Sequence, residues 1–103
     1  MPELIKKTYF VFDSISRNNP MLKIIEFLVE NKEQDFTISE ISGGADVART
    51  TLWNGILESL LNEGIITKTR DVGNAKLYKL NIQDEKVKAI IKLYETLKRV
   101  KNV

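Results

Sequence analysis

The sequence predicts a mainly α-helical fold with one small β-hairpin. Three observations lead to this prediction. Apolar residues recur at intervals of three and four along most of the chain, as they do on one face of a helix. Helix stop and start signals interrupt the pattern, most clearly at Asn19-Pro20 and at Gly64. Only residues 65–80 differ, because there two β-prone stretches flank a turn at Gly73-Asn74.

Composition indicates a single folded domain over residues 1–103. The chain has 103 residues, of which 43% are hydrophobic and 29% are charged, and its formal net charge is +2. No apolar run approaches the roughly 20 residues that a membrane-spanning helix needs, so we expect a cytoplasmic protein. The sequence contains no cysteine and no histidine, which removes the usual metal ligands, nucleophiles and general base. We therefore expect no cofactor, no metal and no enzymatic activity.

Two helices are expected before residue 32. The first covers residues 2–17 and the second runs from Pro20 to about Asn31. Asn19 can cap the second helix, and Pro20 suits its first position because the missing N–H has no partner there. The second helix is apolar nearly all round, so we expect it at the centre of the core.

A helix-turn-helix is expected over residues 37–63. Thr37 and Glu40 have the spacing of a capping box, and Phe36 and Ile41 occupy the positions of a hydrophobic staple around it. We expect Gly43-Gly44 to end this short helix.

A longer helix is expected to follow, capped by Asp46 and unbroken as far as Gly64. One half of its helical wheel is apolar, whereas the other half carries small and polar residues that would allow close approach to DNA. Trp53 falls near the middle of the apolar half, so we expect it in the core. A contact between Trp53 and the DNA backbone is the alternative.

The hairpin at residues 65–80 is basic, with Lys68, Arg70, Lys76 and Lys79 against Asp71 alone. Such a hairpin directly after a helix-turn-helix is the arrangement of a winged helix. The fold class that we predict is accordingly a winged helix-turn-helix with about five helices and a two-stranded wing.

The last helix is expected over residues 84–101, with its capping residue left open among residues 81–85. An apolar stripe with a partial heptad spacing runs along it, longer than the core of so small a domain requires. We expect this stripe, together with the leading helix, to form a homodimer interface. The expected interface residues are Tyr9, Phe12, Val87, Ile90, Ile91, Tyr94 and Leu97.

Six sequence stretches carry a family resemblance, namely residues 12–15, 19–28, 37–41, 48–54, 60–66 and 76–80. In their order and spacing the chain resembles, over about residues 9–81, the winged helix-turn-helix transcription regulators of the ArsR and MarR type, especially their small archaeal relatives. It departs from that pattern in three ways. The interval from Thr51-Leu52 to Gly64 is one residue longer than expected, the arginine usual near Pro20 is absent, and the metal-sensing cysteines and histidines are missing.

The resemblance implies sequence-specific binding to double-stranded DNA by a homodimer that regulates transcription, on a near-palindromic operator. The recognition helix would contact DNA through Arg49, Thr50, Thr51 and Asn54, and the wing through Lys68, Arg70, Asn74 and Lys76. Whether a small effector molecule binds stays open.

Other interpretations stay open at this point. The recognition-helix residues could form an ordinary solvated face, and the basic wing could serve solubility by discouraging strand pairing between molecules. The protein could also coat or partition DNA as an accessory factor, or use its winged helix for contact with another protein.

Overall fold

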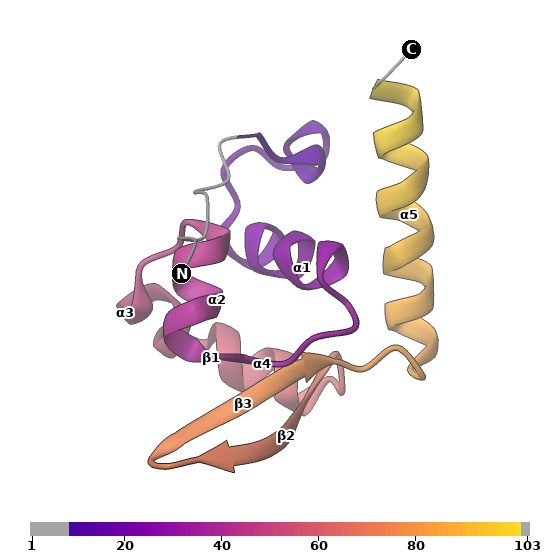
Figure 1. The fold of residues 1–103 in the computed structure, drawn as a ribbon. Helices are drawn as coiled ribbons and strands as arrows, with labels where there is room; N and C mark the ends of the chain where they lie inside the picture. Colours follow the sequence, from indigo (N-terminus) through magenta and orange to yellow (C-terminus); the bar gives the residue numbers. More distant parts are fainter. Residues whose placement is uncertain (1–8, 102–103) are drawn as a thin grey trace, which may run out of the picture.

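The computed structural model describes residues 9–101 and shows a mainly helical chain with one small antiparallel sheet (Figure 1). This confirms the predicted balance of helix and strand. The elements in chain order are η1 (Val11–Ser14), α1 (Pro20–Glu30), β1 (Phe36–Thr37), α2 (Ile38–Ala45), α3 (Arg49–Thr51), η2 (Leu52–Ile56), α4 (Leu57–Asn62), β2 (Ile66–Val72), β3 (Ala75–Leu80) and α5 (Glu85–Lys101).

Helix α1 lies at the centre of the core, as its apolar sequence predicts. The Asn19 side chain caps it by accepting a hydrogen bond from the Leu22 N–H at 3.0 Å, and Pro20 occupies its first turn. Six successive residues from Ile24 to Val29 are buried. The cap and the burial confirm both predictions for this helix.

The predicted first helix, residues 2–17, is wrong for the residues that the structure describes. Residues 2–8 lie outside the described part, and residues 9–17 form only one short 3-10 turn, η1. The carboxylate of the fully buried Glu26 is the physical reason. It accepts hydrogen bonds from the Val11 N–H at 2.7 Å and the Phe12 N–H at 2.8 Å, which binds these donors to α1 instead of to a preceding helical turn.

Helix α2 begins at the predicted capping box. Glu40 N–H donates to Thr37 Oγ1 at 3.2 Å, and Thr37 N–H donates to Glu40 Oε1 at 2.9 Å. The expected stop at Gly43-Gly44 is wrong, because the helix continues to Ala45 and ends at Asp46, whose φ is 57°. Gly44 serves packing instead, since a Cβ atom there would lie 2.2 Å from the ring of Phe27 in α1.

The single helix expected from Asp46 to Gly64 is also wrong. Helical geometry holds from Arg49 to Trp53, breaks at Asn54 (φ −82°, ψ 54°) and Gly55 (φ 97°, ψ −21°), and resumes at Ile56. Across the break the Leu57 N–H donates to the Leu52 carbonyl, five residues back, so this turn holds one residue more than an α-helical turn.

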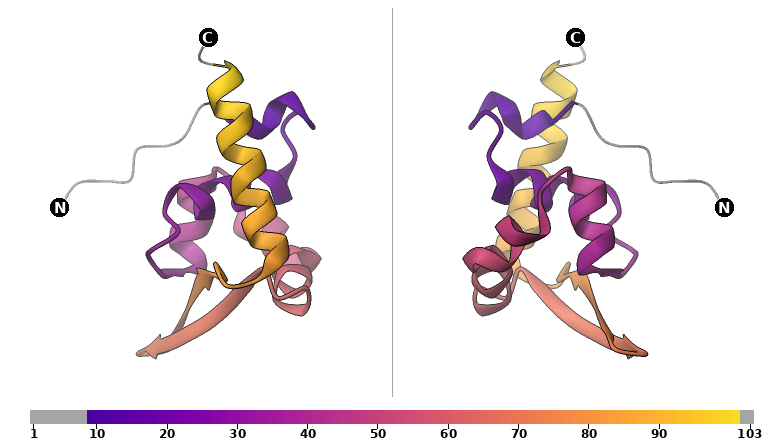
Figure 2. Two further views of the ribbon diagram at one scale, coloured as in Figure 1. Left: turned by 90° about the vertical axis from the view of Figure 1, so that its right-hand side faces the viewer. Right: turned by 90° about the vertical axis from the view of Figure 1, so that its left-hand side faces the viewer.

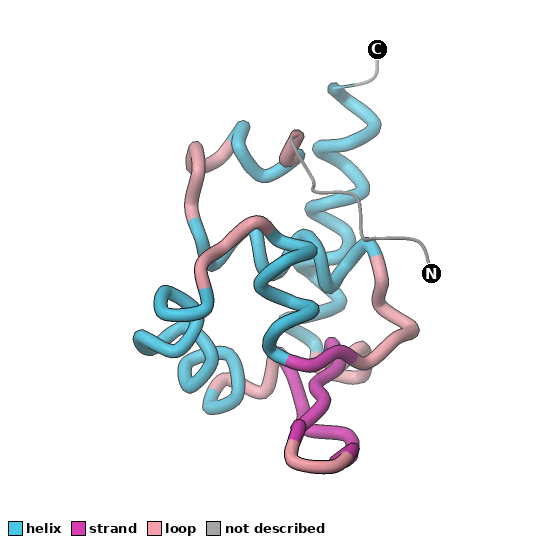
Figure 3. The backbone as a smooth tube through the Cα atoms, turned by 60° about the vertical axis from the view of Figure 1, so that its left-hand side comes forward, coloured by secondary structure: helices cyan, strands magenta, loops and turns pink. Residues whose placement is uncertain are grey.

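The sheet has three strands in the order β1-β3-β2, rather than the predicted two. The hairpin β2–β3 turns at Gly73 as expected, and the short strand β1 pairs with β3 through Phe36 opposite Tyr78. A bulge interrupts the β2–β3 register between Lys68 and Arg70. The hairpin projects away from the helices in every view (Figures 2 and 3).

Helix α5 stands beside α1 and η1 (Figure 1). Asp84 caps it by accepting hydrogen bonds from the Lys86 and Val87 N–H groups, which resolves the capping position that the sequence left open. The Tyr94 hydroxyl donates to Glu30 Oε2 at 2.7 Å, and burial together with this carboxylate raises the pKa of Tyr94. Among the described residues, no helix is both long and apolar enough to cross a bilayer.

Three of the expected dimer-interface residues belong to the core of the single chain. Phe12, Val87 and Tyr94 are buried, and the rings of Phe12 and Tyr94 meet edge to face at a centroid distance of 6.0 Å. Ile90, Ile91 and Leu97 are half-buried against the same core, whereas Tyr9 is exposed. The α5 residues with the most exposed apolar side chains are Leu93 and Val100.

Candidate nucleic-acid interface

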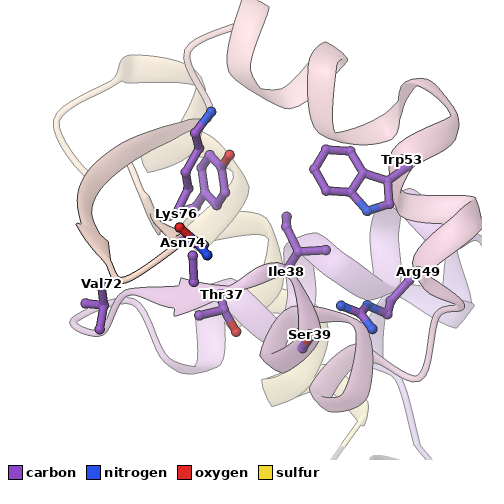
Figure 4. Close-up of a pocket in the computed structure, with 10 residues that line it drawn as sticks. Thr37, Ile38, Ser39, Arg49, Trp53, Val72, Asn74 and Lys76 are labelled. Carbon is purple, nitrogen blue, oxygen red and sulfur yellow. The ribbon is translucent and has the colours of Figure 1, made fainter.

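A groove of about 610 Å³ lies between the α3–η2 segment and the β2–β3 hairpin (Figure 4). Three parts of the chain line it. The start of α2 contributes Thr37, Ile38 and Ser39, the α3–η2 segment contributes Arg49 and Trp53, and the hairpin contributes Val72, Asn74, Ala75, Lys76 and Tyr78. The groove therefore joins the two elements in which the sequence predicts DNA contacts.

Arg49 and Trp53 form the helical side of the groove. They are four residues apart in helical backbone, which places both side chains on one face of the segment. Figure 4 shows them on the same side of Ile38, with Asn74 and Lys76 across from them. Trp53 is 60% exposed, so the expectation that it lies in the core is wrong.

Both charged residues that line the groove are cations. Arg49 and Lys76 are its charged residues, and none of the described residues that line it is an Asp or a Glu. Both cations are exposed, and the described residues give neither of them a salt bridge. The sequence segment around Arg49 is acidic on average. Of its carboxylates, Glu40 lies at the edge of the groove, where it accepts a hydrogen bond from the N–H of the lining residue Thr37 at 2.9 Å.

The other predicted recognition residues lie close to Arg49 but outside the lining. Thr50 is exposed beside it, and Thr51 is half-buried. Asn54 is exposed within the break, so its predicted place on a regular helical face is wrong. Its amide lies within the non-helical turn of η2.

Arg70 lies outside the set of residues that line the groove. It pairs with Leu77 across strands β2 and β3. The structure therefore separates Arg70 from Asn74 and Lys76, with which the sequence grouped it.

Asp35 holds Arg70 in that position. Arg70 Nε donates to Asp35 Oδ2 at 2.9 Å and Arg70 Nη2 donates to Asp35 Oδ1 at 3.3 Å, a two-pronged pairing. Thr69 Oγ1 also donates to Asp35 at 2.6 Å, since the bulge turns both neighbours toward the same carboxylate. Hydrogen bonds from Arg70 and then Thr69 lower the pKa of Asp35 to about 2, and Asp35 in turn raises the pKa of Arg70.

Lys68 is likewise paired with a carboxylate. Its Nζ lies 2.7 Å from Asp71 Oδ2, three residues along the same strand, and both side chains are exposed. Of the four predicted wing contacts, the groove thus contains Asn74 and Lys76, whereas Lys68 and Arg70 lie outside its lining.

Sequence reasoning named Trp53 as a contact residue only as the alternative to a place in the core, and it missed the other groove-lining residues. One signal could have favoured the groove for Trp53. Asn54-Gly55 is a dipeptide typical of turns, and a turn directly after Trp53 removes the reason to place that residue on a continuous apolar face. Thr37, Ser39 and Tyr78 carry no comparable signal, because only the pairing of β1 with β3 brings them to the groove.

Comparisons of the chain with models of protein families, with curated protein sequences and with solved structures find no match.

Proposed function

We propose that the protein is a winged helix-turn-helix DNA-binding protein that acts as a homodimeric transcription regulator in the cytoplasm. The observation that carries the proposal is the groove between the α3–η2 segment and the hairpin, which presents Arg49 and Lys76 and no carboxylate from its lining residues. A surface of this charge attracts the phosphate backbone despite a net charge of only +2.

The order of elements supports the same proposal. A capped short helix (α2), a tight turn and a second helical segment (α3–η2) precede an antiparallel hairpin that projects from the molecule. In this arrangement the α3–η2 segment would enter the major groove and offer Arg49 to a guanine edge or to a phosphate. Thr50 and Asn54 would lie beside it.

The proposed dimer would place two recognition segments in successive major grooves, about one helical turn apart, on a near-palindromic operator. Leu93 and Val100 on α5 are the exposed apolar groups that such a dimer would cover. Phe12, Val87 and Tyr94 would support the interface from within each chain.

Selection of bound fragments from a genomic library, followed by nuclease footprinting, tests the proposal. We expect retardation of duplex fragments at low salt and one bounded, roughly palindromic footprint. A footprint that spreads with protein concentration would instead indicate a DNA-coating protein. The absence of any retardation at low salt would contradict DNA binding and favour a role in protein contact.

A further inference from the structure

The β2–β3 hairpin follows two registers, one on each side of its bulge. Toward the base of the hairpin Lys68 lies opposite Tyr78, and toward the tip Arg70 lies opposite Leu77. Two steps along β2 therefore match one step along β3. Thr69 is the extra residue and has no partner of its own in β3.

The sequence of the tip also fits a hairpin without this bulge. In the observed register the turn consists of Gly73 and Asn74, and Gly73 has a φ of 61°. If the register of the base continued to the tip, the loop would instead be Val72-Gly73-Asn74. Hairpin loops of this length commonly end in a left-handed residue, a conformation that asparagine tolerates. In this bulge-free register the opposed pairs would be Thr69 with Leu77, Arg70 with Lys76 and Asp71 with Ala75.

Asp35 stabilises the bulged register alone. It directly precedes β1, and β3 lies between β1 and β2, so its carboxylate reaches across β3 to the bulge. There Asp35 accepts hydrogen bonds from Thr69 Oγ1 at 2.6 Å and from Arg70 Nε at 2.9 Å. In a regular strand the side chains of neighbouring residues point to opposite faces, so one carboxylate could not hold both. The contacts of Asp35 and the bulge therefore support each other.

We propose that Asp35 is a positioning residue that selects the bulged register of the hairpin, and that its loss lets the tip shift by one residue. In the shifted register Arg70 replaces Asp71 opposite the groove-lining Lys76. Opposed side chains of an antiparallel pair lie about 5 Å apart, so two cations then meet beside the groove. Asp35 prevents this by holding the guanidinium of Arg70.

The consequence for DNA binding rests on the proposed function. Two opposed cations repel each other, so the shifted register gains stability when a backbone phosphate lies between them. Asp35 thus restrains DNA binding, because it pairs with Arg70 and keeps it away from Lys76. Each further phosphate contact adds about 0.9 to the slope of log affinity against log salt.

The first experiment measures the register without DNA. The chain has no cysteine, so two introduced cysteines report on one opposed pair. Asp71→Cys with Lys76→Cys forms a disulfide in the observed register, whereas Asp71→Cys with Ala75→Cys does so in the shifted register.

We expect Asp35→Ala to raise the yield of the second disulfide relative to the first by about tenfold, because hydrogen bonds to a charged group are lost. Glu33→Ala, which removes an exposed carboxylate from the same connector, is the control and should leave the ratio unchanged. Arg70→Met removes the other partner from a side chain that is 61% exposed, so it should shift the ratio without unfolding the chain. If Arg70→Met and a folded Asp35→Ala both keep the wild-type ratio, or if Asp35→Ala unfolds and Arg70→Met keeps that ratio, the inference is overturned.

The second experiment measures duplex affinity over a range of salt concentrations, in chains without the introduced cysteines. Asp35→Ala should steepen the slope of log affinity against log salt by about 0.9, and Glu33→Ala should not. An unchanged slope in a variant with a shifted register would overturn the restraint on DNA binding. A wild type that binds no duplex would contradict the proposed function, whereas the disulfide ratio would still decide whether Asp35 selects the register.

Discussion

Gly44 shows at the scale of one residue how closely α2 approaches α1. A Cβ atom at this position would lie 2.2 Å from Cε1 of Phe27, whereas at the neighbouring Gly43 it would meet nothing within 4 Å. Both glycines belong to α2, where alanine is the better helix former. An alanine at Gly44 therefore changes both packing and helix propensity, whereas an alanine at Gly43 changes helix propensity alone.

We expect Gly44→Ala to destabilise the fold by about 1–3 kcal/mol, because the added methyl group overpacks the contact with Phe27. Gly43→Ala should instead stabilise it by about 0.5–1 kcal/mol through helix propensity alone. Urea unfolding of the two variants measures the difference. Equal effects of the two substitutions would contradict the close packing of α2 on α1.

Asp35 makes stability dependent on pH in a defined window. Its pKa lies at about 2 in the folded chain, below the ordinary value of 3.8, because Arg70 and Thr69 donate hydrogen bonds to its ionised form. A depressed carboxyl pKa adds stability that is fully present above the ordinary pKa and is lost as pH falls toward the folded value. The window is therefore about pH 4 down to about pH 2.

Asp35→Asn should lower the urea midpoint at neutral pH and reduce the further loss of stability between about pH 4 and about pH 2. Glu33→Gln, in the same connector, is the matched control. It removes the same charge from an exposed side chain and leaves the Asp35–Arg70 pair intact. An unchanged acid-induced loss in Asp35→Asn would show that this pair does not contribute to stability in acid.

The break in the α3–η2 segment is a feature at the scale of a single element. Gly55 has a φ of 97°, in the region that favours glycine, and no atom lies within 4 Å of where its Cβ would be. Substitution of Gly55 is therefore limited by the backbone conformation and not by contacts with neighbouring atoms.

We expect Gly55→Ala to destabilise the fold by about 1–2 kcal/mol, because an L-residue pays the left-handed backbone cost there. In a straight helix the same substitution would be stabilising, as it should be at Gly43. Thermal unfolding of Gly55→Ala and Gly43→Ala thus distinguishes the broken segment from the continuous helix that the wheel predicted. A more stable Gly55→Ala would contradict the break.

Sequence reasoning succeeded where the determining residues are close together in the chain. The Asn19-Pro20 cap, the Thr37–Glu40 box and the Gly73 turn depend on neighbours, and each appears as predicted. It failed where a distant partner decides the structure. Glu26 takes the N–H groups of η1 from 14 and 15 residues away, and Asp35 holds Arg70 from 35 residues away.

The prediction of a continuous helix through the α3–η2 segment failed for a different reason. Its apolar spacing fits a continuous helix, and the turn signal of Asn54-Gly55 competes with that pattern locally. The fold follows the turn signal, which moves Trp53 from the predicted core into the groove.

Dimerisation is the prediction at the scale of the whole molecule. The apolar side chains that α5 leaves exposed include Leu93, which is 42% exposed, whereas Val87 and Tyr94 belong to the core of the single chain. We expect the wild type to sediment as a dimer and Leu93→Asp to sediment as a folded monomer, because a carboxylate at the interface would be buried without a partner.

Leu61→Asp is the control for this prediction. Leu61 is a comparably exposed leucine on α4, so its replacement should leave the dimer intact. A wild type that is monomeric at micromolar concentration, or a dimeric Leu93→Asp variant, would contradict the assignment of α5 to a dimer interface.

The central claim is that the groove between the α3–η2 segment and the hairpin binds the DNA backbone, and the salt dependence of duplex affinity tests it most directly. Arg49→Ala and Lys76→Ala should each weaken binding and reduce the slope of log affinity against log salt by about 0.9, the value for one phosphate contact. Arg99→Ala and Lys92→Ala remove the same charges from exposed positions on α5 and should leave the slope unchanged. Equal slopes for the groove variants and the α5 variants would contradict the claim.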